Sequence, residues 1–77
     1  MNAAKANQLA RASALIILRE KISLAANRGQ TQVAGYFGLS QDAAEWATER
    51  LSNEDGYRCS LQGAFGNIYV SIFWEVQ

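Results

Sequence analysis

Apolar side chains recur every three or four residues in the N-terminal third of the chain, the pattern of a helix with one buried face. Between Asn2 and Asn27 the sequence has neither glycine nor proline and is rich in good helix formers. Asn2 can cap the first turn, and Gly29 can end the helix in the left-handed conformation. We therefore expect one long helix that buries Leu15, Leu18, Ile22 and Ala25.

The C-terminal third shows the two-residue alternation that is typical of strands. Tyr57, Cys59 and Leu61 alternate with polar residues, and the turn-forming segment GAFGN follows at 63–67. A second alternating run then begins, with one set of side chains on each face. We predict an antiparallel hairpin whose second strand points Ile68, Val70, Ile72, Trp74 and Val76 to one side and Tyr69, Ser71, Phe73 and Glu75 to the other.

The middle of the chain allows two interpretations. Ser40 is a good helix N-cap, and a helix to about Asn53 would place Ala43, Ala47 and Leu51 on one face. The residues before it, Thr31 to Phe37, are locally ambiguous. As a strand they would give the hairpin a third member; as a helix they would complete a winged helix-turn-helix.

The winged-helix alternative fits the spacing of small and apolar residues but not the chemistry of DNA binding. Its recognition helix would present Asp42, Glu45 and Glu49 to the phosphates, where cationic side chains are needed. We therefore favour an α+β fold in the order α-β-α-β-β, with the helices on one face of a three-stranded sheet. Nucleic acid is an improbable partner in either fold.

Length and composition narrow the functions further. The 77 residues form a single domain, 1–77, small enough that self-association would add stability. The chain contains no histidine and one cysteine, Cys59, so histidine catalysis, an internal disulfide and a cysteine zinc site are excluded. We expect a non-enzymatic protein without metal or cofactor. The apolar run 12–18 is too short to span a membrane, and we expect a cytoplasmic location.

Charge is distributed unevenly although the net charge is zero. Residues 1–30 carry a net charge of +4 and residues 31–77 a net charge of −4. We favour the interpretation that the two halves complement each other, within the fold or between subunits. The alternative is a basic first helix that meets an acidic partner.

The second face of the hairpin carries the candidate binding residues. Tyr69 and Phe73 would stand opposite the core, beside Arg58, with Phe65 in the turn. Exposed aromatic and arginine side chains of this kind are typical of binding surfaces, unless the first helix or a second subunit covers them. Trp46, at the border of the small-residue face of the second helix, is a further candidate. The proposed binding residues are Tyr69, Phe73, Phe65, Arg58 and Trp46.

Four short segments resemble a family of small uncharacterised proteins of tailed bacteriophages. They are the opening MNAAKANQLA, Gly29 to Val33, the GYRC segment at 56–59 and the closing YVSIFWEV, which resemble the family's MxAKEA-like start, its G-x-x-x-V segment, its G-Y-x-V strand and its I-x-W strand. The chain departs from that pattern at Cys59, where valine is usual, and in a longer segment between Leu39 and Gly56.

The resemblance implies phage origin and the strand interpretation, and it supplies no catalytic or binding residues. Together with the residues above, it leads us to expect an accessory protein of the infected host cell that self-associates. Such a protein would bind a host protein or a signalling ligand, in host takeover or against a host defence. The alternatives are a winged-helix transcription regulator and a minor structural protein of the virion.

Overall fold

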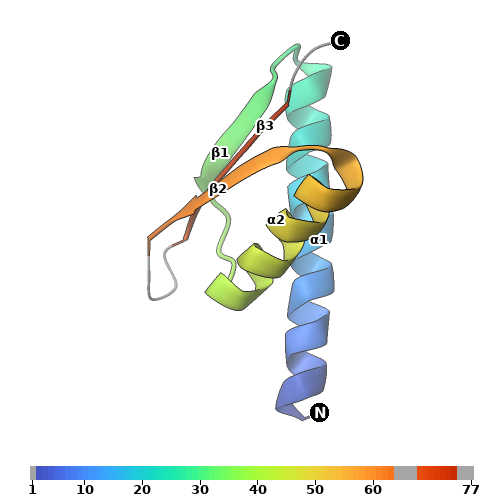
Figure 1. The fold of residues 1–77 in the computed structure, drawn as a ribbon, viewed down its shortest axis with the longest axis vertical. Helices are drawn as coiled ribbons and strands as arrows, with labels where there is room; N and C mark the ends of the chain where they lie inside the picture. The colour runs from blue at the N-terminus through green and yellow to red at the C-terminus, as the bar shows by residue number, and fades with distance from the viewer. Residues whose placement is uncertain (1, 64–67, 75–77) are drawn as a thin grey trace.

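A computed structural model of the chain describes residues 2–63 and 68–74. Two helices and three strands follow one another in the order α1 (Ala3–Asn27), β1 (Gln32–Tyr36), α2 (Gln41–Asp55), β2 (Arg58–Gln62) and β3 (Tyr69–Phe73). Figure 1 shows both helices on the same side of the sheet. The predicted α+β order α-β-α-β-β is confirmed.

Helix α1 has the ends that its sequence predicts. The Asn2 side chain accepts a hydrogen bond from the Lys5 backbone N–H at 2.9 Å, and Gly29 follows the helix with φ of 77°. The buried face differs slightly from the predicted stripe, because Leu15 is only half-buried and Ala14 is fully buried. The buried face of α1 is therefore centred on Ala14 and not on Leu15, and this smaller side chain lets α2 approach closely.

The sheet has the strand order β1-β3-β2, and both of its pairings are antiparallel. The last of the described strands, β3, thus lies in the middle, between the predicted hairpin partner and a strand from much earlier in the sequence. Val33 and Cys59 both align with Ile72 of β3. Residues 32–36 are therefore a strand and not a helix. The winged-helix alternative is wrong because this segment is hydrogen-bonded into the sheet.

Alanine residues line the contact between the two helices. Ala14 of α1 and Ala43, Ala44 and Ala47 of α2 are at most 2% exposed, and all belong to the main apolar core. Thr48, the one buried polar residue of the described chain, donates its hydroxyl hydrogen bond to the Ala44 carbonyl at 2.7 Å. Larger side chains complete this core: Leu18, Ile22, Leu39, Leu51, Ile68, Val70 and Ile72.

Helix α2 is longer at its C-terminal end than expected. It continues past Asn53 to Asp55 and stops at Gly56, whose φ of 76° is left-handed. The Gly56 N–H bonds the Leu51 carbonyl, so this glycine ends the helix and turns the chain into β2.

Ion pairs join the basic α1 to the acidic α2. The Arg11 guanidinium donates two hydrogen bonds to the Asp42 carboxylate, each at 2.9 Å. Arg19 lies 3.5 Å from Asp55 and 3.9 Å from Glu54. The prediction that the two oppositely charged halves complement each other within the fold is confirmed for these pairs.

Candidate functional site

The sheet has one face toward the helices and one face away from them, and the register assigns each side chain to a face. Three rows cross the outer face: Gln32, Phe73 and Arg58; Ala34, Ser71 and Ser60; Tyr36, Tyr69 and Gln62. We call these nine residues the outer face. Its middle row contains only small side chains, and an aromatic group lies at each end.

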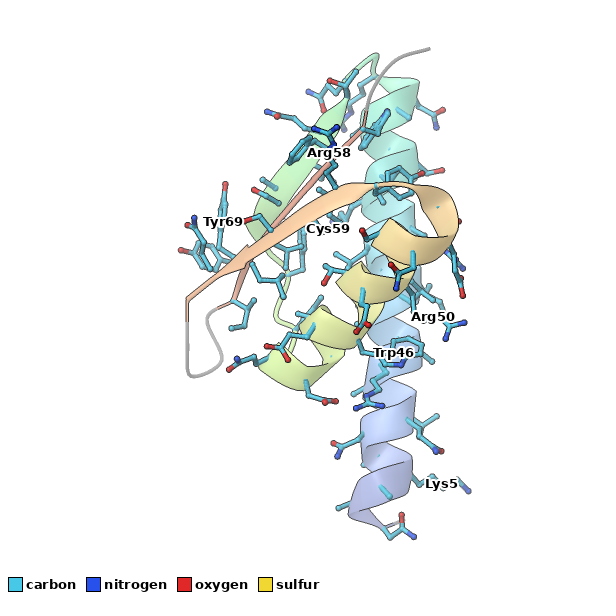
Figure 2. The ribbon with its side chains drawn as sticks, in the orientation of Figure 1. Lys5, Trp46, Arg50, Arg58, Cys59 and Tyr69 are labelled. Carbon is cyan, nitrogen blue, oxygen red and sulfur yellow. The ribbon has the colours of Figure 1, made fainter. Side chains whose placement is uncertain are left out.

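The aromatic side chains of the outer face are accessible. Tyr36 is 69% exposed and Phe73 is 40% exposed, while Tyr69 is half-buried. The Tyr36 and Tyr69 rings meet edge to face with their centroids 5.1 Å apart. In Figure 2, Tyr69 lies on the side of the sheet away from α1 and α2. Tyr36, Tyr69, Gln62 and Gly63 line a shallow hollow of about 340 Å³ at this end.

Three of the five predicted binding residues come together on this surface. Arg58 aligns directly with Phe73, and Tyr69 lies four residues before Phe73 on the same face of β3. Tyr36 was missed by the sequence reasoning. Its signal was available, because Tyr36 stands three residues from the inward-facing Val33 and so belongs to the opposite face of the predicted strand.

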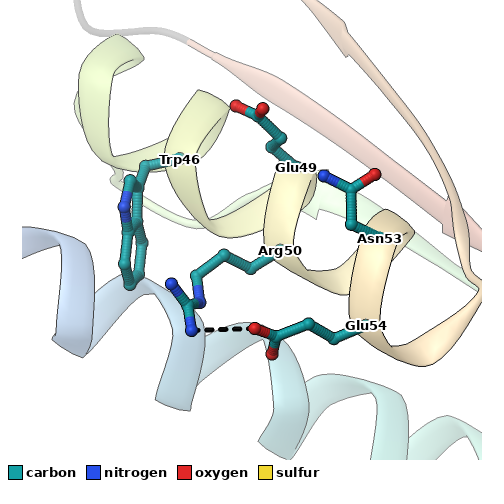
Figure 3. Close-up of a pocket in the computed structure, with 5 residues that line it drawn as sticks. All are labelled: Trp46, Glu49, Arg50, Asn53 and Glu54. Atoms are coloured by element: carbon teal, nitrogen blue, oxygen red, sulfur yellow. Dashed lines mark hydrogen bonds and ion pairs between the residues drawn. The ribbon is translucent and has the colours of Figure 1, made fainter.

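Trp46 lies elsewhere, on α2. Its half-buried ring packs against the core, and the Arg50 guanidinium carbon lies 4.9 Å from the ring centroid. Arg50 also bonds Glu54 at 2.8 Å, as Figure 3 shows, at the border of a hollow of about 340 Å³ that includes Glu49 and Asn53. Trp46 is therefore held by its own helix and does not join the outer face. Phe65, the fifth predicted residue, lies outside the described residues.

Cys59 faces the helices from β2 and is partly buried against the core. This burial raises the pKa of the Cys59 thiol, because the charged thiolate loses solvation. A raised pKa lowers the fraction of thiolate at neutral pH, so the side chain suits packing better than nucleophilic attack.

The described residues contain no cluster of three or more aspartate, glutamate or cysteine side chains that could hold a metal ion. Among the helices at 3–27 and 41–55, neither is long and apolar enough to cross a membrane. The outer face offers aromatic rings, amides, hydroxyls and one guanidinium, which is chemistry for recognition by contact and hydrogen bonding. Comparisons with protein families, with curated proteins and with solved structures found no match for this chain.

Proposed function

We propose that this chain is a non-enzymatic accessory protein that binds another protein through the outer face of its sheet. The observation that carries the proposal is the exposure of Tyr36 and Phe73 on a sheet face that neither α1 nor α2 covers. Tyrosine, phenylalanine and arginine are enriched at protein interfaces, and tyrosine and arginine are over-represented among the residues that supply most of the binding energy.

The shape of the outer face favours a protein over a small signalling ligand. The two aromatic ends, Phe73 and Tyr69, are separated by four strand positions, which is about 13 Å at the usual rise per residue. A partner that contacts both ends must span the row of small residues between them. A loop or strand of a protein has this reach, and its backbone can use the hydroxyls of Ser60 and Ser71.

The resemblance to tailed-phage proteins suggests where the partner is found. An accessory protein that has no catalytic groups acts by binding, and the proteins available to it are those of the infected bacterial cell. We therefore propose a protein of the host cell as the partner, in host takeover or against a host defence. Once a single partner is known, its own function decides between these two roles.

Capture from bacterial lysate, followed by binding measurements with the purified partner, tests the proposal. The test variant combines Tyr69→Ser and Phe73→Ser, which removes the aromatic contacts without changing the inward-facing core. The control is Leu9→Ser, which removes a side chain 50% exposed on α1. We expect the double variant to bind at least about tenfold more weakly and the control to bind as the wild type does. Equal binding by all three proteins would contradict a role for the outer face.

A further inference from the structure

Strand β1 lies at an edge of the sheet, and its outward backbone groups can be identified from the register. The Trp74 N–H donates to the Thr31 carbonyl at 3.0 Å, which makes Thr31 and Trp74 a hydrogen-bonded pair. Bonded and non-bonded pairs alternate in an antiparallel ladder. Val33 and Gly35 therefore bond to β3, while the N–H and C=O groups of Gln32, Ala34 and Tyr36 point away from the sheet.

Within residues 2–63 and 68–74, no hydrogen bond from another element reaches these outward groups. The strand also lacks the features that usually protect an edge: the segment Gln32–Tyr36 contains no charged residue and no proline. The opposite edge differs, since β2 carries the charged Arg58. The unprotected backbone of β1 is thus a surface suited to another strand.

We propose that a second copy of this chain pairs with β1 along this edge, antiparallel and about a two-fold axis at Ala34, so that the two sheets become one. This interface uses outward backbone groups of β1, whereas the function proposed above uses the aromatic side chains of the outer face, and the inference does not depend on that function. The two-fold axis places Ala34 opposite Ala34 and Gln32 opposite Tyr36. Each of these pairs can exchange two backbone hydrogen bonds, which gives about six bonds across the interface.

In this register the side chains of β1 in one copy are complementary to those of β1 in the other copy. On the outer face, the Gln32 amide of one copy meets the Tyr36 hydroxyl of the other, and no like charges are brought together. On the inner face, Val33 of one copy lies beside Gly35 of the other. The Phe37 ring lies over this glycine, 3.3 Å from the position a Cβ would take, and offers the valine an apolar contact.

An exposed leucine borders the same edge on the helix side. The Lys21 amine lies 5.9 Å from the centre of the Phe37 ring, so this flank of α1 is next to the end of β1. Leu24 is one turn further along that flank and is 52% exposed. A second copy on the β1 edge brings its own α1 to this flank, since both helices lie on the same side of the joined sheet.

Introducing a charge at Ala34 tests the pairing. The two-fold axis places residue 34 of one copy opposite residue 34 of the other, so two like charges face each other in each variant. Ala34 is exposed on the outer face, so Ala34→Lys and Ala34→Glu leave the core unchanged. By native mass in sedimentation, we expect the wild type to form a dimer. Each variant alone should dissociate at least about tenfold more readily, and an equimolar mixture of the two should recover the dimer.

Ala34→Pro and Ala34→Ser form a second, charge-free pair. Proline removes the outward N–H and spares the bonds from β1 to β3, and a proline at such an edge position is compatible with a strand. We expect a monomer with proline and a dimer with serine, and a dimer with Phe73→Ser because Phe73 lies on the central strand β3 and not on the edge strand. The inference is overturned if the wild type is monomeric, if the Lys and Glu variants dimerise alone or stay monomeric when mixed, or if the Pro variant retains the wild-type dimer.

Discussion

The alanine contact between α1 and α2 makes a specific prediction about stability. Ala47 is fully buried, as are Ala14 and Ala44, so the helices leave no room for a longer side chain. We expect Ala47→Leu to lower the free energy of unfolding by about 2 kcal/mol. Overpacking a filled core costs about 1–3 kcal/mol even though the added carbons are apolar.

This loss is large for a chain of 77 residues, whose total stability is roughly 4–12 kcal/mol at 0.05–0.15 kcal/mol per residue. Urea unfolding followed by circular dichroism gives the free energy directly, and the melting temperature should fall by about 8–16 °C.

The matched control is Ala26→Leu, which makes the same change at an exposed position of α1. We expect the control to stay within about 0.5 kcal/mol of the wild type. If the Ala47→Leu variant were as stable as the Ala26→Leu variant, the close approach of the two helices would be refuted.

Three further changes probe an ion pair, a helix end and a buried thiol. The hydrogen bonds from Arg11 lower the pKa of Asp42, so this contribution to stability is present at neutral pH and is lost as the pH falls through that lowered value. Melting curves should show Asp42→Asn less stable than the wild type at pH 7, with the difference shrinking below the ordinary aspartate pKa of 3.8. Gly56→Ala should cost about 1 kcal/mol in urea unfolding and Gly56→Asn less, because space at Gly56 is open and only its left-handed φ opposes a side chain. Cys59 should react with a thiol reagent more slowly in the folded protein than in urea at the same pH, and equal rates would contradict its raised pKa.

Local sequence patterns account for most of the secondary structure. The hairpin strands follow from two-residue alternation, and both helices follow from their spacing and caps. Residues 31–37 stayed ambiguous because Ala34 and Gly35 are poor strand formers, although Val33 and Tyr36 are good ones. The segment is a strand because it pairs with residues 69–73, a contact between distant parts of the chain that no local pattern contains.

The candidate site was predictable to the same extent. Alternation alone places Tyr69, Phe73 and Arg58 on one face. The contact of Tyr36 with Tyr69 depends on the strand order, which puts β3 between β1 and β2. Trp46 was a candidate because it borders the small-residue face of the second helix, but its position on α2 separates it from the outer face of the sheet.

The central position of β3 has a consequence for synthesis on the ribosome. Neither β1 nor β2 has a strand to pair with until residues 69–73 have left the exit tunnel, since both bond only to β3 within the described sheet. Until then the nascent chain can form α1 and α2 but exposes two unpaired strands. The sheet therefore forms only after β3 has been made and has left the ribosome, and a nascent chain that still lacks β3 is helical and aggregation-prone.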